Sequence, residues 1–446
     1  MCSSDLTRPV TASAPPPAER SPRTTSQVIR SLAPSVYIPS LLEFTGQAAL
    51  MPVIPLLALQ LGFSVPQAAA LTTIFGIASF LGPIPAGRLI SRVGARPALV
   101  TTGSLLVVAN LVAFTVISHG LEAGAGLAHQ LTLVGLLTMM AASAQVWMLG
   151  RQSYLGTALP PAMRARGMTM FGGVIRIGQV AGPLLGALVL ALGHDTGVFV
   201  LYAVTACGAT VMVATFLPAG ELRGGRSAPR GRRPRPSQAR TRLTRAVLSR
   251  MVMVGVGIAP VMISRVNRPV IIPLLGASLG LESMWVSIVF GVSAVIEILL
   301  VIPAGTLMDR YGRVAVAVPC ALVNGAGYLL LAVMTQALAG DGVTAAVVAL
   351  LVPSMVIAVG NGLGSGIVMT LGIDVSPVHD RTRYLAWWNT LMGAGRLTAP
   401  LLVTGITVVA PVAVAGAVTG ALCVAGGAWL ARALPRLTPS GSTRGR

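Results

Sequence analysis

The sequence predicts an all-α integral membrane protein with twelve transmembrane helices, arranged as two parallel six-helix pseudo-repeats. Three observations support this: the composition, twelve apolar stretches of membrane-spanning length, and a weak internal repeat. Of 446 residues, 54% are hydrophobic and only 10% are charged, whereas soluble domains carry about 25% charged residues. Because so few charges cannot coat a water-soluble body of this size, the composition excludes a soluble enzyme.

Twelve apolar stretches are long enough to cross a bilayer, which takes about 20 residues of helix. They are continuously apolar rather than alternating, and this excludes a transmembrane β-barrel. Internal prolines are compatible with membrane helices, because neighbouring helices satisfy the freed backbone groups. The stretches cover residues 35–61, 67–87, 97–118, 130–158, 168–193, 197–217, 251–279, 284–306, 314–337, 344–372, 384–409 and 412–431.

The positive charges indicate the orientation in the membrane. All 32 basic residues are arginine, against 12 acidic residues, for a net charge of +20. Of these arginines, 27 lie at the termini and in alternate loops on one side of the membrane, and the opposite loops hold none. The positive-inside rule therefore predicts that both termini are cytoplasmic. We expect a multi-pass protein of the plasma membrane. We interpret the arginine-rich central loop as part of this topology signal, and we expect no nucleic acid partner.

A repeat divides the chain. Residues 84–87 recur at 302–305, a spacing of 218, and several prolines and arginines recur at 217. Since both copies place basic loops on the cytoplasmic side, the halves are parallel and each needs an even number of spans. The predicted units are a disordered basic tail, a six-helix bundle, an arginine-rich linker, a second six-helix bundle and a tail, at residues 1–34, 35–217, 218–250, 251–431 and 432–446.

Two short cytoplasmic loops carry a matched motif. The loop after the second span reads GRLISRVGAR and includes Gly87, Arg92 and Gly94. Its counterpart after the eighth span reads GTLMDRYGR and includes Gly305, Asp309, Arg310, Gly312 and Arg313. Both resemble the G-x-x-x-D-R-x-G-R pattern of the major facilitator superfamily of secondary transporters, and the resemblance covers residues 35–431. It implies the fold of that superfamily and alternating access, but no substrate.

The first loop departs from the pattern, because Ser91 stands where the acidic residue belongs. A carboxylate at that position can interact with a helix N-terminus or an arginine and so lock one conformation. Asp309 can carry this charge and Ser91 cannot. We therefore expect an asymmetric latch, formed by the second loop alone.

The fifth span spaces small residues four apart, which places them on one helix face and allows close packing with a neighbour. The residues are Gly178, Gly182, Pro183 and Gly186. Their pattern resembles the fifth-span motif of proton-coupled drug antiporters, in which that span is shaped for export. The match is partial, because Ala187 replaces the final glycine.

Seven ionisable residues fall within the spans, where a charge is costly and marks a functional candidate. They are Glu43, Arg151, Arg176, Arg265, Arg268, Glu297 and Arg396. All seven lie on spans that, by the resemblance, line the central cavity or stand beside it. Further candidates for the cavity wall are the polar residues Gln47 and Asn267 and three tryptophans, Trp147, Trp387 and Trp388.

Two interpretations of these charges remain open. In the structural one, Arg265 and Arg268 pair with Glu297, and Arg176 and Arg396 bond to backbone carbonyls. In the functional one, Glu297 or Glu43 takes and releases a proton, and the arginines bind an anionic group. Five arginines against two carboxylates leave three unbalanced positive charges, which a substrate carboxylate or phosphate would compensate.

We expect a secondary active transporter and no enzyme. It would move a small organic molecule by alternating access, in proton-coupled efflux by antiport. The alternatives are an importer or facilitator of an anionic metabolite and a transporter-like membrane sensor or scaffold. The expected partners are that substrate, protons and the lipid bilayer, and the protein is expected to be a monomer. Four cysteines and four histidines show no ligand spacing, so no metal or cofactor is expected.

Overall fold

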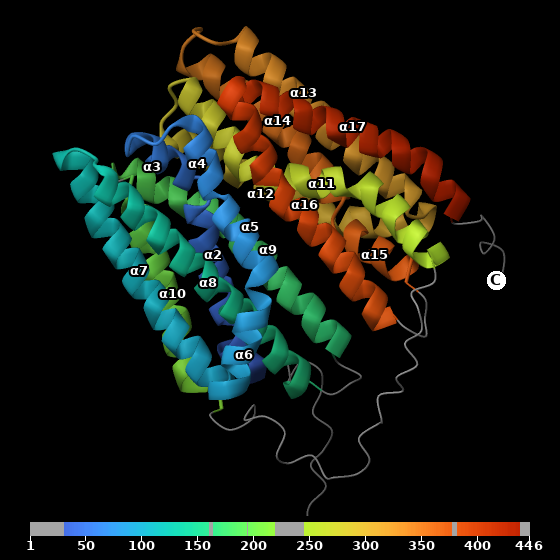
Figure 1. The fold of residues 1–446 in the computed structure, drawn as a ribbon, viewed down its shortest axis with the longest axis horizontal. Coiled ribbons are helices and arrows are strands. Elements are labelled where there is room, and N and C mark those ends of the chain that lie inside the picture. Colours follow the sequence, from blue (N-terminus) through green and yellow to red (C-terminus); the bar gives the residue numbers. More distant parts are fainter. Residues whose placement is uncertain (1–30, 160–163, 194, 219–244, 377–380, 438–446) are drawn as a thin grey trace, which may run out of the picture.

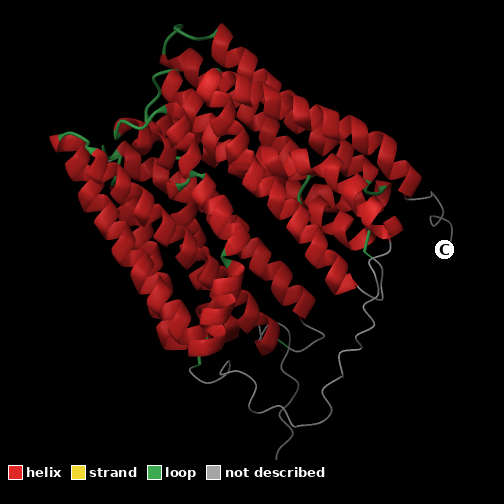
Figure 2. Ribbon diagram, viewed as in Figure 1, coloured by secondary structure: helices red, strands yellow, loops and turns green. Residues whose placement is uncertain are grey.

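The computed structural model describes residues 31–159, 164–193, 195–218, 245–376 and 381–437. Within these ranges the chain forms helices and loops and no strand (Figure 2). Eleven helices of the described chain are long and apolar enough to cross a membrane, and one bent helix pair supplies a twelfth span. The prediction of an all-α membrane protein with twelve spans is confirmed.

The first half forms six spans. The first consists of the π-helical turn η1 (Ala33–Tyr37), α2 (Ile38–Leu50) and α3 (Ile54–Gln60), and the second of α4 (Val65–Leu71), α5 (Thr73–Leu81) and α6 (Pro83–Val93). The next four are α7 (Ala95–Ala123), α8 (Leu127–Ala158), α9 (Arg164–Ala191) and α10 (Gly197–Phe216). The second span bends by 56° between α5 and α6, where Pro83 and Pro85 lack backbone donors.

The second half repeats the plan. Its spans are α11 (Arg245–Ser278), α12 (Ser283–Tyr311), α13 (Val314–Ala337), α14 (Val343–Leu363) with α15 (Ile367–Asp374), α16 (Arg381–Val409) and α17 (Val412–Leu437). Two boundaries correct the sequence prediction. The helix α11 begins inside the predicted linker, and α17 continues past the predicted start of the tail at residue 432. Both extensions contain arginines, which end an apolar stretch without ending the backbone hydrogen bonds of a helix.

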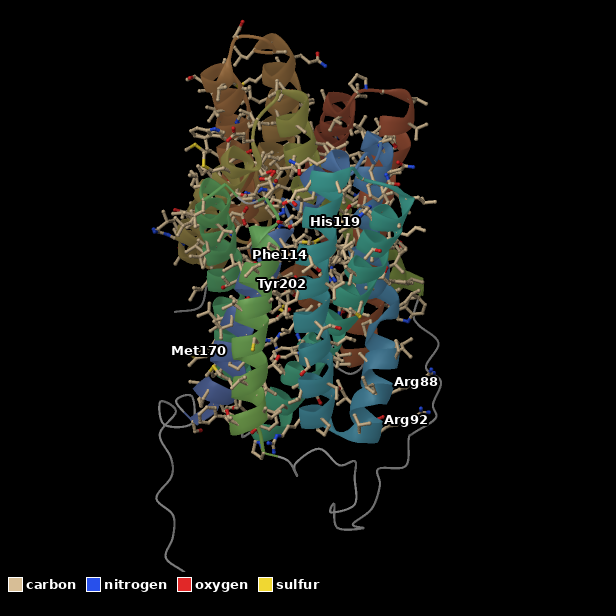
Figure 3. All side chains as sticks on the ribbon, turned by 90° about the vertical axis from the view of Figure 1, so that its left-hand side faces the viewer. Arg88, Arg92, Phe114, His119, Met170 and Tyr202 are labelled. Atoms are coloured by element: carbon tan, nitrogen blue, oxygen red, sulfur yellow. The ribbon has the colours of Figure 1, made fainter. Side chains whose placement is uncertain are left out.

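The two halves lie side by side (Figure 1). Arg88 and Arg92, at the end of α6, lie at one end of the bundle, and His119 lies toward the other (Figure 3). We call the end with Arg88 and Arg92 the arginine end. Since α12 occupies the place of α6 in the second half, its last turn, with Arg310, lies at the same end.

The hydrophobic core is shared at one end and divided at the other. Away from the arginine end, one buried cluster includes Leu57 of the first half and Leu274 of the second. Toward the arginine end, Leu155 belongs to a cluster made only of first-half residues, and Met308 to one made only of second-half residues. The halves are therefore joined at one end and apart at the other.

Candidate functional site

A cavity of about 400 Å³ lies between the two halves. Its walls come from α2, α5, α8 and α9 of the first half and from α11 and α12 of the second. Its polar and aromatic lining comprises Gln47, Gln145, Gln179, Phe44, Phe75, Phe290, Arg176, Arg265, Arg268 and Glu297. Binding sites for small molecules combine an apolar wall with a few convergent polar groups. This cavity is therefore the candidate site, and it brings together five of the nine residues that the sequence nominated for substrate or proton binding.

Three helices of the second half share a polar network at the cavity. Arg268 Nη1 donates to Glu297 Oε1, and Asn361 Nδ2 donates to the same oxygen at 3.4 Å. Arg265 donates from Nε to Asn361 Oδ1 at 3.3 Å and from Nη2 to the Asn361 carbonyl at 2.9 Å. The pair of Arg268 with Glu297 is as the structural interpretation expects, but Arg265 bonds to Asn361 rather than to Glu297. Asn361 was missed because a lone amide in an apolar span carries no charge signal.

Two cavity arginines have no acidic partner among the described residues. Arg176 reaches the cavity from α9 of the first half and Arg265 from α11 of the second. The ion pairs of the described chain are Glu43–Arg151, Arg268–Glu297 and Arg313–Asp374, so neither of these two guanidinium groups is neutralised. The cavity wall therefore carries three positive charges and one negative charge.

A second intramembrane ion pair lies behind the cavity wall. Arg151 Nη2 donates to Glu43 Oε2 at 2.7 Å, and the two side chains are 1% and 2% exposed. The guanidinium also lies over the Trp147 ring, at 5.0 Å, and over the Phe44 ring, at 5.6 Å. Glu43 and Arg151 were nominated separately, and the fold joins them across 108 positions of sequence. Neither lines the cavity, and their nomination for substrate or proton binding stays a prediction.

Other nominated residues also lie away from the cavity. Asn267 is fully buried and donates from Nδ2 to Thr419 Oγ1 at 3.1 Å, so it connects α11 to α17. Arg396 is an exposed residue of α16 that does not line the cavity. Trp147 and Trp388 are buried between helices, and Trp387 is exposed. The aromatic walls are instead phenylalanines, because the face of each helix that meets the cavity is set by packing.

The two motif loops share one backbone feature. Gly94 and Gly312 adopt φ values of 95° and 84°, a region open to glycine and strained for other residues. Gly87 and Gly305 instead lie within α6 and α12. Arg92 and Arg310 are exposed.

The loops differ in their polar contacts. In the second loop, Arg313 Nε donates to Asp374 Oδ2 of α15 at 2.8 Å. This pair connects the second loop to α15. The side chain of Asp309 lies outside the described residues. In the first loop, Ser91 Oγ donates to the Arg88 carbonyl at 2.9 Å.

The small-residue face of α9 lies against α2. A methyl group on Gly178 would come within 2.9 Å of the Leu41 carbonyl oxygen, and one on Gly182 within 2.5 Å of the Thr45 carbonyl oxygen. A methyl group on Gly186 would lie 3.4 Å from Ala49 Cβ. Pro183, on the same helix, lines the cavity. The close helix approach expected from the spacing is present at these glycines.

Comparison with known proteins gives a family and a fold. The family model described as Major Facilitator Superfamily matches residues 36–266 and 254–445. No curated protein matches.

Solved structures with the same fold include the peptide transporter POT in complex with alafosfalin, with TM-score 0.70, 14% identity and coverage of 93% of this chain and 99% of that one. A bacterial homologue of the iron transporter ferroportin, in an inward-facing state, gives TM-score 0.69, 15% identity and coverage of 92% and 100%. The nucleoside transporter NupG gives a TM-score of 0.66 and 13% identity, with coverage of 91% of this chain and 99% of that one.

Proposed function

Because this chain belongs to the Major Facilitator Superfamily, we propose that it is a secondary active transporter whose central cavity binds a small organic molecule with an anionic group. One observation carries the proposal. Arg176 and Arg265 enter the same cavity from opposite halves, and no carboxylate among the described residues neutralises them. A carboxylate or phosphate between them would form charge-assisted hydrogen bonds with both.

The orientation in the membrane follows from the arginine end. The positive-inside rule assigns this end, with both termini, to the cytoplasm of a plasma-membrane protein. Since the halves are joined by a common core only at the other end, the conformation described here would open toward the cytoplasm. Rocking of the halves around the cavity would then expose it to the other side.

Glu297 is the better candidate for proton coupling. Its side chain is 26% exposed at the cavity, whereas that of Glu43 is 2% exposed and bonded to Arg151. A proton on Glu297 would release Arg268 and make the cavity more positive, which favours an anion. By linkage the anion would then favour the proton to the same extent.

This charge balance bears on the direction of transport. Cooperative binding of proton and anion supports movement of both in one direction, which favours the proton-coupled importer of an anionic metabolite. The antiport of a proton against an exported molecule is supported by the resemblance of the fifth span to drug antiporters. Antiport needs a substrate that competes with the proton, such as a cation that binds Glu297.

Reconstituted proteoliposomes test the proposal. A panel of labelled organic anions, neutral analogues and cations is offered under inward and outward pH gradients. We expect flux of at least one anion that depends on the pH gradient, and Glu297→Gln should remove that dependence. Flux of cations alone would contradict the anion site, and flux indifferent to the gradient would contradict proton coupling. A folded protein that moves nothing in the panel would favour a membrane sensor or scaffold.

A further inference from the structure

The tenth span is interrupted beside the cavity. Between α14 and α15, the Ser365 N–H bonds to the Gly362 carbonyl at 3.1 Å instead of reaching the Asn361 carbonyl, four residues back, as in an unbroken helix. Gly366 follows in the left-handed region with φ of 84°. The interruption therefore frees the Asn361 carbonyl, and a buried free carbonyl needs another donor.

Arg265 supplies that donor. Its Nη2 donates to the Asn361 carbonyl at 2.9 Å, and its Nε faces the Asn361 side-chain oxygen at 3.3 Å. A guanidinium holds five N–H groups in one plane. Asn361 thus occupies the Nε–Nη2 edge, which fixes the plane and leaves Nη1 available to the cavity that Arg265 lines. One side chain serves both the cavity and the interruption.

The two sides of the interruption are held differently. Before it, a methyl group on Gly362 would lie 2.7 Å from Leu300 Cβ of α12, so α14 is closely fixed. After it, a methyl group on Gly366 would meet no atom within 4 Å. The segment α15 is tied instead to α16, since Trp388 Nε1 donates to the Val368 carbonyl at 3.0 Å. A change at the interruption would therefore move α15, and α16 with it, relative to α14.

We propose that Arg265 couples anion binding in the cavity to the conformation of α15, and that Asn361 is the positioning residue for this coupling. The proposal rests on the anion-binding role of Arg265 proposed above. An anion that turns the guanidinium weakens its bond to the Asn361 carbonyl. The Ser365 N–H can then return to that carbonyl and extend α14 by one helical hydrogen bond, which reorients α15.

Asn361 also connects this device to the acidic group of the cavity. Its Nδ2 faces Glu297 Oε1 at 3.4 Å, on the oxygen that Arg268 also binds. The same amide therefore contacts the arginine that would hold the anion and the carboxylate that would hold the proton. The anion and the proton would therefore both act, through Asn361, on the interruption between α14 and α15.

The test measures the distance between α15 and α13. Both helices belong to the second half, so rocking of the halves leaves this distance unchanged. Spin labels are placed at Met369→Cys in α15 and Val333→Cys in α13, positions that are 73% and 63% exposed, with Cys2 and Cys207 replaced by serine. The purified full chain is measured alone, with benzoate, and with benzamide as the uncharged analogue of the same shape. We expect benzoate, and not benzamide, to shift the distance distribution.

Variants identify the residue responsible. Asn361→Ala removes the side-chain contact with Arg265 that the anion would otherwise have to displace. It should therefore tighten benzoate binding by up to roughly tenfold, the equivalent of one hydrogen bond to a charged group, and it should abolish the shift. Asn267→Ala is the matched control, because it also removes a buried amide from a helix contact, but away from the cavity. It should keep both the affinity and the shift. An Asn361→Ala protein with unchanged affinity and an unchanged shift would overturn the proposal.

A ligand-free comparison separates this proposal from the proposed function. Arg265→Lys keeps the positive charge but loses the two-point contact with Asn361, so the distance should change without any ligand. If benzoate fails to bind the parent protein, the proposed anion site is disproved. The ligand-free distance in Arg265→Lys still tests the role of Arg265 at the interruption between α14 and α15. An unchanged distance in Arg265→Lys would reject the role of Arg265 at the interruption.

Discussion

Equivalent helix pairs of the two halves pack with different closeness. In the first half, a methyl group on Gly178 of α9 would lie 2.9 Å from the Leu41 carbonyl oxygen of α2. Gly395 of α16 occupies the equivalent place, 217 residues later. A methyl group on Gly395 would have its nearest neighbours, which belong to α11, at 4.0 Å. The repeat therefore conserves the order of helices but not their fit. At these positions α9 packs more tightly on α2 than α16 does on α11, and α16 has room beside α11 at Gly395.

The intramembrane ion pairs show the same contrast. The Glu43–Arg151 pair of the first half is sealed, whereas the Arg268–Glu297 pair of the second half faces the cavity and extends to Asn361 and Arg265. A sealed pair has no access to a ligand, so we assign it to stability. The Arg268–Glu297 pair borders the cavity, so a bound ligand could exchange partners with it.

The largest expected effect is the loss of stability when the sealed Glu43–Arg151 pair is broken. Glu43→Gln leaves the Arg151 charge buried without its partner and should lower the free energy of unfolding by about 3–5 kcal/mol. Denaturation in detergent measures it. The double variant Glu43→Gln with Arg151→Gln should recover most of this loss, since no uncompensated charge remains. Glu297→Gln should cost no more than about 1 kcal/mol, because its carboxylate is partly solvated. Equal losses in the two single variants would remove the contrast.

The next effect concerns Arg265 and Gln47, which stand at equivalent positions 218 residues apart and both line the cavity. Arg265→Gln should weaken binding of a transported anion by about 10- to 100-fold, because a charge-assisted hydrogen bond is lost. Gln47→Ala should weaken it about fivefold at most, as for a neutral hydrogen bond. Competition against a labelled anion measures both. Similar losses would mean that the cavity binds its ligand symmetrically.

The packing contrast predicts a smaller loss of stability. Gly178→Ala inserts a methyl group against the α2 backbone and should cost about 1–3 kcal/mol. Gly395→Ala has the space for a methyl group and should change stability by less than about 0.5 kcal/mol. Thermal unfolding of the two variants, side by side, checks the difference. A Gly395→Ala protein as unstable as Gly178→Ala would show that α16 is as tightly held as α9.

The smallest expected effect is on the transport rate, when residues of the two motif loops are changed. Asp309→Asn removes a charge that the latch hypothesis requires and should slow transport by about two- to fivefold, the rate equivalent of a helix-end interaction. Ser91→Ala should leave the rate unchanged. Initial rates at equal membrane expression decide the matter, and matching losses in the two variants would rule out an asymmetric latch.

The sequence predicted the spans well because each span is a local property, set by about 20 consecutive apolar residues. It also located the cavity charges, since an ionisable residue in a span is conspicuous. It did not predict which of them meet. Glu43 and Arg151 are distant in sequence, Asn361 carries no charge, and Asn267 points toward α17 although Arg268, its neighbour, faces the cavity. Such outcomes depend on the rotation of each helix about its axis, which only contacts with other helices determine.

The sequence alone thus determined the class of protein, the number of spans, the parallel repeat and the family, because composition, apolar length and short motifs are written along the chain. The tertiary structure decided the cavity, the partner of each charge, the sealing of one ion pair and the interruption at Asn361. The physical reason is that a buried polar group must find a partner wherever packing brings one. For Arg265 that partner is a backbone carbonyl on another span, which no pattern in the sequence announces.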